Sequence, residues 1–354
     1  MLTPPFTCTR CIDVTGQPVA ALPALARDRE AAVAIYRALL LTRQFDTKAI
    51  ALQRTGRLGT YASSHGQEAV SVGIASAMQP QDVLLPSFRE HGAQLLRGVP
   101  AHALYQYWGG DERGSAAIAE RGDFPNCLSI GSQAPHAAGV ALAFKLERKP
   151  HVAVCVFGDG ASSKGDVYEA MNMAGVWQLP VLFVITNNQW AISLPVTRQT
   201  AATSLAQKAI AAGFDGEQVD GNDVFAVHAS VSSALAHARA GRGPRCIEAL
   251  TYRIADHTTS DDARRYRSEA ALEEPRKADP IARVERFLRA HFAWQDSEQV
   301  AIEAECRSII EAAEAQYLDA PLEPAQAMFD NLYARLPEVY REQRASLQKG
   351  AHDD

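Results

Sequence analysis

Five residues at two points of the chain carry groups suited to binding a metal ion and a diphosphate. The first point is the run Gly158, Asp159, Gly160 and Ala161, and the second is Asn188. Magnesium prefers hard oxygen ligands and commonly takes one or two protein carboxyls or amides together with substrate phosphates. The Asp159 carboxylate and the Asn188 amide oxygen are such ligands, and the backbone N–H groups of Gly160 and Ala161 suit a diphosphate. These residue types predict a metal and diphosphate site.

A parallel sheet is required to bring these two points together. The run 152–157 (VAVCVF) is apolar, β-branched and too short for a helix, so it predicts a buried strand that ends at the glycine turn. Apolar residues at helical spacing predict a helix over 162–177, and the run 181–186 (VLFVIT) predicts a second strand. A strand, helix and strand in this order form a right-handed crossover between parallel strands. Asp159 and Asn188 then lie at the same edge of the sheet.

Composition indicates a globular protein without a nucleic-acid or membrane partner. The 354 residues carry a formal net charge of −6, and 47% of them are hydrophobic. This charge provides no basic field for nucleic acid, and no apolar run is long enough to span a membrane. We expect a cytoplasmic protein, because no signal or transit peptide is evident and the six cysteines do not form a disulfide framework. Cys8 and Cys11 form a lone CxxC that we expect to be inert.

Turn residues and apolar spacing outline the rest of the chain. We expect three regions, which are an N-terminal arm over residues 1–28, an α/β domain over 29–270 and a helical extension over 271–354. A short strand is expected before Pro86, and another over 245–253. The expected helices span residues 29–52, 133–146, 280–292, 300–318 and 324–336.

The GDG run followed by paired asparagines resembles the thiamine diphosphate motif of thiamine-dependent enzymes. Residues 56–70 (GRLGTYASSHGQEAV) are similar to the corresponding segment of 2-oxo acid dehydrogenase alpha subunits. Over nearly its whole length the chain resembles the alpha subunit of the thiamine diphosphate-dependent first component of a 2-oxo acid dehydrogenase complex. This resemblance implies an α/β fold, in which a parallel sheet has helices on both faces and further helices follow at the C-terminus. It also implies thiamine diphosphate and Mg²⁺ as cofactors.

The resemblance assigns cofactor contacts at several points of the chain. Arg89 matches an arginine that contacts the diphosphate, whereas Phe88 stands where the family has a tyrosine and leaves only an aromatic wall. Main-chain groups of Leu128 and Ile130 would bind the aminopyrimidine ring, with the Ile130 side chain beneath the bent cofactor. The main-chain carbonyl of Trp190 would be a further metal ligand beside the aspartate and asparagine.

Catalytic roles also follow from the resemblance. The family has a histidine at the reactive carbon of the cofactor, and His257 matches it in the run ADHTTSDD. Tyr61 would lie near the bound substrate, His91 would assist the reaction, and Arg253 would serve as a phosphate-binding or loop-ordering cation. From the residues alone, a structural role stays open for each of them, such as ordinary packing for Tyr61 and His91.

The expected reaction is the oxidative decarboxylation of a 2-oxo acid with acyl transfer to a lipoyl group. We expect pyruvate as the substrate, because a GRLG-aromatic-Ala sequence is frequent in bacterial pyruvate dehydrogenases. A branched-chain 2-oxo acid or acetoin dehydrogenase is the alternative, and a non-catalytic metal and phosphate module is an alternative from another class. The expected partners are a beta subunit in an α2β2 assembly, which supplies a catalytic glutamate, and a lipoyl-bearing acyltransferase.

Overall fold

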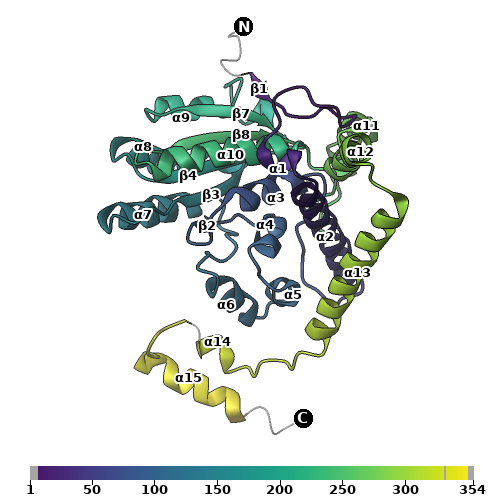
Figure 1. Cartoon of the computed structure of the whole chain (residues 1–354). Coiled ribbons are helices and arrows are strands. Elements are labelled where there is room, and N and C mark those ends of the chain that lie inside the picture. Colours follow the sequence, from purple (N-terminus) through teal and green to yellow (C-terminus); the bar gives the residue numbers. More distant parts are fainter. Residues whose placement is uncertain (1–6, 331, 350–354) are drawn as a thin grey trace.

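A parallel β-sheet forms the centre of the computed structural model, which describes residues 7–330 and 332–349 (Figure 1). In the order in which they pair, the six strands are β1 (Cys8–Thr9), β7 (Gly216–Asp220), β8 (Arg245–Leu250), β4 (Val181–Asn187), β3 (Ala153–Gly158) and β2 (Val83–Leu85). Every pairing in this sheet is parallel. The carboxyl ends of the strands therefore lie along one edge, as the sequence predicts.

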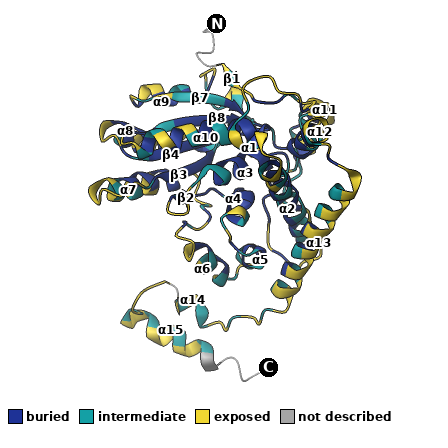
Figure 2. Ribbon diagram, in the orientation of Figure 1, coloured by how far each residue is buried: buried dark blue, intermediate teal, exposed yellow. Residues whose placement is uncertain are grey.

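The central strands are apolar along their length because helices cover both faces of the sheet. One set of strand side chains, which includes Val156 and Val184, packs with α3 (Glu68–Ala77) and α10 (Val224–Arg239). The alternate set, which includes Phe157, packs with α7 (Gln133–Leu146) and α8 (Gly165–Val176). Figure 2 shows the strands buried between these two helical layers. The predicted α/β fold with helices on both faces is confirmed.

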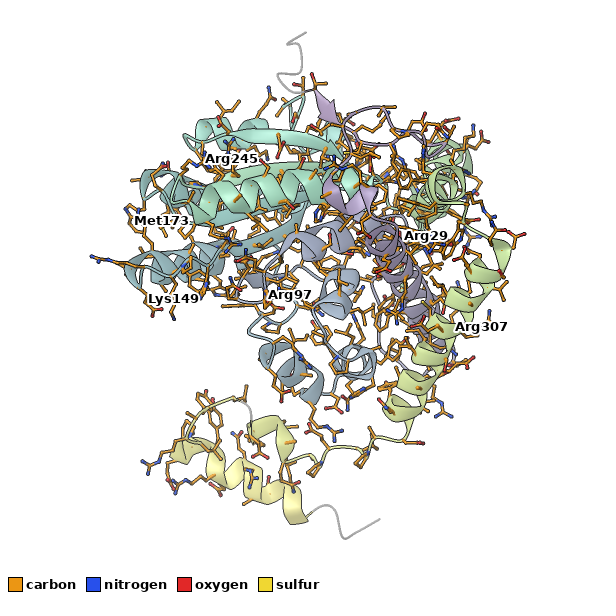
Figure 3. All side chains as sticks on the ribbon, viewed as in Figure 1. Arg29, Arg97, Lys149, Met173, Arg245 and Arg307 are labelled. Atoms are coloured by element: carbon orange, nitrogen blue, oxygen red, sulfur yellow. The ribbon has the colours of Figure 1, made fainter. Side chains whose placement is uncertain are left out.

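The long helix α2 (Arg29–Arg54) connects the sheet to the C-terminal helices. It packs against α12 (Pro280–Phe292) and α13 (Asp296–Leu318). Arg29, which Figure 3 labels at the start of α2, forms an ion pair of 2.5 Å with Glu298 of α13. A further apolar cluster includes residues of α2, α5 (Ala101–Gly109), α6 (Arg113–Ala119) and α13.

The remaining elements are short or peripheral. Two short strands, β5 (Trp190–Ala191) and β6 (Leu194–Pro195), pair in antiparallel fashion beyond β4. The other helices are α1 (Ala24–Arg27), α4 (His91–Leu96), α9 (Gln207–Ala211), α11 (Glu273–Lys277), α14 (Ala327–Asp330) and α15 (Glu338–Lys349). The described residues also form the 3₁₀ turns η1 (Asp159–Ser163), η2 (Val196–Arg198), η3 (Ala263–Arg265) and η4 (Glu269–Leu272). No helix of the described residues combines the length and the apolar character that crossing a bilayer requires.

The N-terminal segment takes a larger part in the fold than the expected surface arm. Strand β1 pairs with β7 at the edge of the sheet, and Cys11 and Ile12 are buried in the core. Their backbone N–H groups donate to the Asp223 carboxylate at 2.7 and 2.8 Å. Residues 1–6 lie outside the described part of the chain. The core also extends past both expected region boundaries, because α12 contributes Val284 and Phe287 to the same cluster.

The last predicted helix differs from the structure. The spacing of Met328, Leu332 and Leu336 predicts one helix, but α14 ends at Asp330 and α15 begins at Glu338. The proline at position 337 disfavours helical backbone at the residue before it. Helix α13 instead begins earlier than predicted, at Asp296, because Gln295 and Glu298 form a capping box.

Candidate functional site

The carboxyl ends of four adjacent strands meet at one cavity of ≈ 260 Å³. The loop after β2 brings Phe88 and Arg89, and the turn after β3 brings Asp159. Asn188 follows β4, and His257 lies in the loop after β8. Of the residues expected to contact the cofactor, the lining contains Phe88, Arg89, Ile130, Gly158, Asp159, Gly160, Ala161, Asn188, Trp190 and His257.

The two side chains expected to bind the metal, those of Asp159 and Asn188, face this cavity and differ in charge. Asp159 is only 2% exposed, and burial raises the pKa of its carboxyl. Its only side-chain donor among the described residues is Gln199, whose Nε2 lies 2.8 Å from Oδ2. The Asn188 Oδ1 atom accepts a hydrogen bond of 3.2 Å from the Trp190 N–H. A buried carboxylate without a cationic partner fits a bound metal ion, which would supply the missing positive charge.

This donor set suits a metal ion that shares its coordination with phosphate oxygens. No group of three or more His, Cys, Asp or Glu side chains in the described residues is arranged to hold a metal. One carboxylate, one amide oxygen and a main-chain carbonyl are too few for an all-protein site. Magnesium commonly completes such a set with substrate phosphates and water.

The turn that carries Asp159 is fixed by close packing and by a buried lysine. The backbone around Gly160 and Ala161 forms the 3₁₀ turn η1, and α8 begins only at Gly165, a few residues after the predicted start. A Cβ atom added at Gly160 would lie 2.7 Å from Cβ of Ala191, so β5 leaves room for glycine alone. Lys208 Nζ donates to the Ser162 carbonyl at 2.5 Å and to its Oγ at 3.0 Å.

Three buried arginines give the site positive charge. Arg89, Arg253 and Arg267 take part in no ion pair among the residues that the structure describes. They donate mainly to main-chain carbonyls, for example Arg89 to Ser63 at 2.5 Å and to His257 at 2.7 Å. Burial and the charge of Arg253 lower the pKa of Arg89 to about 10. Buried cations without a directly bonded carboxylate favour an anionic ligand such as a diphosphate.

His257 is held as a neutral side chain. Its Nδ1 atom lies 3.0 Å from Nη2 of Arg89 and 3.4 Å from Nη1 of Arg253. Because a guanidinium only donates hydrogen bonds, Nδ1 must accept and the ring proton is assigned to Nε2. Burial and these two arginines lower the pKa of His257 to about 4. The Asp261 carboxylate accepts the His257 backbone N–H at 2.9 Å and fixes the loop.

Tyr61 and His91 do not reach the cavity. Both are completely buried, and the Tyr61 hydroxyl donates to Asp46 of α2 at 2.8 Å. His91 accepts a hydrogen bond of 3.0 Å from the Trp108 indole at Nε2 and faces the Tyr61 hydroxyl at 3.4 Å with Nδ1. Burial lowers the pKa of His91 to about 4. Tyr61 therefore lies outside the cavity lining, enclosed by α2 and α5.

Two other expected residues also lie outside the cavity lining. Leu128 is 60% exposed, in the loop before α7. Arg253 is buried behind the wall, where its Nη2 donates to the Ile192 carbonyl at 2.7 Å and to the Tyr266 hydroxyl at 2.8 Å. Arg253 therefore connects the loops that carry Ile192 and Tyr266, and its Nη1 lies 3.4 Å from Nδ1 of His257.

Several site residues are missed by the sequence analysis. Gln67, Glu90 and Thr186 line the cavity, and Gln199 contacts Asp159. Burial raises the pKa of Glu90 to about 7, so the cavity wall contains a second carboxyl group. Of these residues, only Gln67 could have been noticed in the sequence. It stands at the start of a helix, at the N-cap of α3, where Ser, Thr, Asp or Asn is preferred over glutamine.

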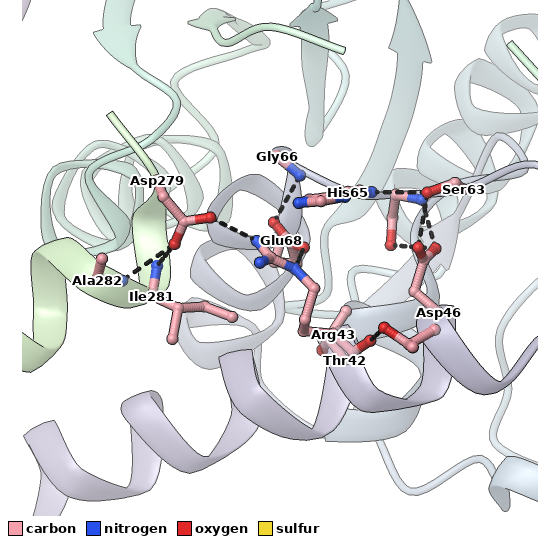
Figure 4. A network of polar contacts seen from close by, with 12 residues as sticks. Thr42, Arg43, Asp46, Ser63, His65, Gly66, Glu68, Asp279, Ile281 and Ala282 are labelled. Carbon is pink, nitrogen blue, oxygen red and sulfur yellow. Dashed lines mark hydrogen bonds and ion pairs between the residues drawn. The ribbon is translucent and has the colours of Figure 1, made fainter. Parts of the chain in front are cut away.

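The loop before α3 is anchored from below by two buried carboxylates (Figure 4). Asp46 accepts the Ser63 hydroxyl at 2.6 Å, and Glu68 accepts the Gly66 N–H at 3.0 Å. Glu68 also pairs with Arg43, which in turn bonds the N-cap carboxylate of α12 at 2.9 Å. The loop that forms one side of the cavity is thus connected to α2, α3 and α12.

The sequence is similar to known proteins over most of its length. Residues 36–326 match the family described as dehydrogenase E1 component. The 3-methyl-2-oxobutanoate dehydrogenase subunit alpha of Mycobacterium tuberculosis is 40% identical over 313 residues, which is 88% of this chain and 85% of that protein. The pyruvate dehydrogenase E1 component subunit alpha of Acholeplasma laidlawii is 39% identical over 318 residues, 89% and 92% of the two chains. The subunit of the same description from Bacillus cereus is 36% identical over 350 residues, which is 96% of this chain and 94% of that protein.

Proposed function

This chain belongs to the dehydrogenase E1 component family, and we propose that it is the alpha subunit of a thiamine diphosphate-dependent pyruvate dehydrogenase. The family in general depends on thiamine diphosphate. The observation that carries the proposal is that Asp159 and Asn188, from neighbouring strand ends, share one cavity with His257. The proposed assembly is an α2β2 component that passes an acyl group to a lipoyl-bearing acyltransferase.

The residues present fit the cofactor that the family uses. Asp159, Asn188 and the main-chain carbonyl of Trp190 would hold Mg²⁺, and the charge of Arg89 would attract the diphosphate. Ile130, 40% exposed and part of the cavity lining, would support the bent cofactor. When bound, thiamine diphosphate supplies a carbon nucleophile and an electron sink for the loss of carbon dioxide from the 2-oxo acid.

His257 would act on the substrate as a hydrogen-bond donor. With Nδ1 occupied by two guanidinium groups, its Nε2–H is the group available to the cavity. A neutral donor there would orient a substrate oxygen and deliver a proton to it. The Phe88 ring meets the His257 ring edge to face at 6.1 Å, so it restricts the position of the imidazole.

A beta subunit would complete the site. Leu128 and Ile130 leave apolar side chains uncovered close to the cavity, which a second chain would bury. Such a chain would also supply the catalytic glutamate against the aminopyrimidine ring. We therefore expect the alpha chain alone to bind thiamine diphosphate weakly and to be inactive. With its complex, we expect it in the cytoplasm.

The test is calorimetric titration of Mg²⁺ and thiamine diphosphate into the chain alone and into the chain co-expressed with its beta subunit. Decarboxylation of pyruvate and of 3-methyl-2-oxobutanoate would then be compared. Binding and turnover of pyruvate only with the beta subunit would support the proposal. Robust turnover by the single chain, or no binding in either state, would contradict it.

A branched-chain substrate is the second candidate. The 40% identity to the Mycobacterium tuberculosis subunit favours it. Each additional methylene in an apolar pocket contributes only about 1–3 kcal/mol of discrimination, and part of this pocket would belong to the beta subunit. A higher kcat/KM for 3-methyl-2-oxobutanoate than for pyruvate would establish this candidate.

A further inference from the structure

We propose that Gln67 is a further cofactor-binding residue, which donates its side-chain amide to an anionic oxygen of the diphosphate and also positions Asn188. The inference rests on the proposed function, because the acceptor belongs to the proposed cofactor. Gln67 lines the cavity together with Asp159 and Asn188, and only 3% of it is exposed. It is therefore part of the wall that would face the metal and the diphosphate.

A backbone N–H determines how the two amides are oriented. The Trp190 N–H donates to Asn188 Oδ1 at 3.2 Å, and this backbone donor cannot be exchanged for an acceptor. Asn188 must therefore present Nδ2 to Gln67, whose Oε1 accepts it at 3.0 Å. If both amides were flipped, the Trp190 N–H would face the Asn188 NH₂ group, donor against donor. The orientation of Gln67 is thus assigned by the contacts and is not arbitrary.

This orientation leaves the Gln67 Nε2 group buried and without an acceptor among the described residues. An unpaired buried donor is destabilising, so such a group in a cavity wall points to a ligand that accepts. A metal ion repels an N–H donor, whereas diphosphate oxygens only accept. Because Gln67 is bonded to Asn188, which would hold the metal, the acceptor closest to its Nε2 would be the diphosphate on that metal.

The position of Gln67 in the fold supports a binding role over a structural one. Gln67 is the N-cap residue of α3, where Ser, Thr, Asp or Asn would stabilise the helix, yet its side chain makes no capping hydrogen bond. Its backbone N–H donates to the Ser64 carbonyl at 2.8 Å, and Glu68 binds the adjacent Gly66 N–H. A rigid loop and a side chain turned away from the helix are what a preorganised ligand contact requires.

Two variants separate the donor role from the positioning role. Gln67→Met removes both the donor and the acceptor while keeping the length of the side chain. Gln67→Glu, measured at pH 8, keeps an acceptor for the Asn188 Nδ2 but places a carboxylate where the diphosphate would lie. Both are tested as the complex with the beta subunit, by calorimetric titration of thiamine diphosphate at saturating Mg²⁺.

We expect Gln67→Met to raise the Kd for thiamine diphosphate about 10- to 100-fold, the range of a hydrogen bond to a charged acceptor. We expect Gln67→Glu to raise it at least as much, without increasing the Mg²⁺ concentration needed for half-saturation. Gln44→Met is the matched control. The Gln44 side chain likewise has one paired end and one buried, unpaired end, but with the roles reversed: its Nε2 donates to the Glu303 carbonyl at 3.2 Å and its Oε1 has no partner among the described residues. It lies between α2 and α13, away from the cavity. Its Kd should equal that of the wild type.

The outcomes that would overturn the inference are distinct from failure of the proposed function. If the wild-type complex does not bind thiamine diphosphate, the proposed function fails first. If the wild type binds and Gln67→Glu binds equally well, Gln67 only positions Asn188 and the donor role is refuted. If cofactor affinity is unchanged in both variants but the KM for the 2-oxo acid rises, the acceptor is the substrate carboxylate, and the diphosphate assignment is wrong. Thermal unfolding of the cofactor-free complex verifies that each variant is folded.

Discussion

The Nδ1 atom of His257 lies 3.0 Å from Nη2 of Arg89, so the loop after β8 and the loop after β2 are joined directly across the cavity. The same guanidinium donates to the His257 carbonyl at 2.7 Å. One arginine therefore contacts both the backbone and the ring of the histidine, and it adds to the effect of burial in favouring the neutral imidazole. The charge that would attract a diphosphate also keeps His257 neutral.

Replacing Arg89 should change the acid limb of the pH-rate profile. Burial and two guanidinium groups depress the pKa of His257 from 6.5 to about 4, and Arg89→Met removes one of these groups, so the pKa should rise part of the way toward 6.5. The acid limb of kcat/KM should then move to higher pH, because the imidazole becomes charged earlier as the pH falls. The Kd for thiamine diphosphate should also rise about 10- to 100-fold. An unshifted acid limb would show that Arg89 does not govern the ionisation of His257.

The two glycines that flank Asp159 should differ in their tolerance of a methyl group. Gly160→Ala places a Cβ atom 2.7 Å from Cβ of Ala191, which forces β5 or η1 to move and should cost about 1–3 kcal/mol of unfolding free energy. Gly158→Ala meets nothing within 4 Å and should change stability by less than about 0.5 kcal/mol. Urea unfolding of both variants without cofactor gives the comparison, and equal stabilities would contradict it.

Lys208 should be required for the stability of the turn that carries Asp159. Lys208→Met leaves the buried Ser162 carbonyl without its 2.5 Å partner and should lower the unfolding free energy by about 1–3 kcal/mol. The matched control is Lys145→Met, which removes a bond of the same length to the Trp177 carbonyl at an exposed site. The control should change stability by less than about 0.5 kcal/mol. Similar losses in the two variants would mean that burial of Lys208 is not the cause.

His91 should make the protein less stable in mild acid. Its pKa is 6.5 when exposed and about 4 in the folded chain, so between these values the unfolded chain binds more protons. The lowered pKa of His91 therefore contributes fully to the free energy of unfolding above pH 6.5. This contribution, about 3 kcal/mol in total, is lost as the pH falls from 6.5 to about 4.

The comparison that isolates this effect is wild type against His91→Gln. Stability would be measured by urea unfolding from pH 7 to pH 4. Glu90 has the opposite effect, because burial raises its pKa to about 7 and favours the folded state at lower pH, but it is present in both proteins. The free-energy difference between the two proteins should shrink as the pH falls. A difference that does not depend on pH would refute the assignment.

The sheet and the metal pair were predictable because they depend on local patterns. Short apolar runs bounded by glycine and proline indicate buried parallel strands, and a right-handed crossover places successive strand ends at one edge. These two rules suffice to bring Asp159 next to Asn188. The β1 strand was not predictable, because its pairing with β7 and the contacts of Cys11 with Asp223 come from far along the chain.

The amino-acid sequence by itself determined the family, the fold class and the ends of the strands that carry Asp159 and Asn188, since motif spacing and strand periodicity are local properties. Only the tertiary structure decided that Tyr61 is enclosed against Asp46, that two arginines hold the His257 ring neutral, and that Gln67 faces the cavity. The physical reason is that burial, ionisation and hydrogen-bond satisfaction depend on which distant segments pack around a side chain.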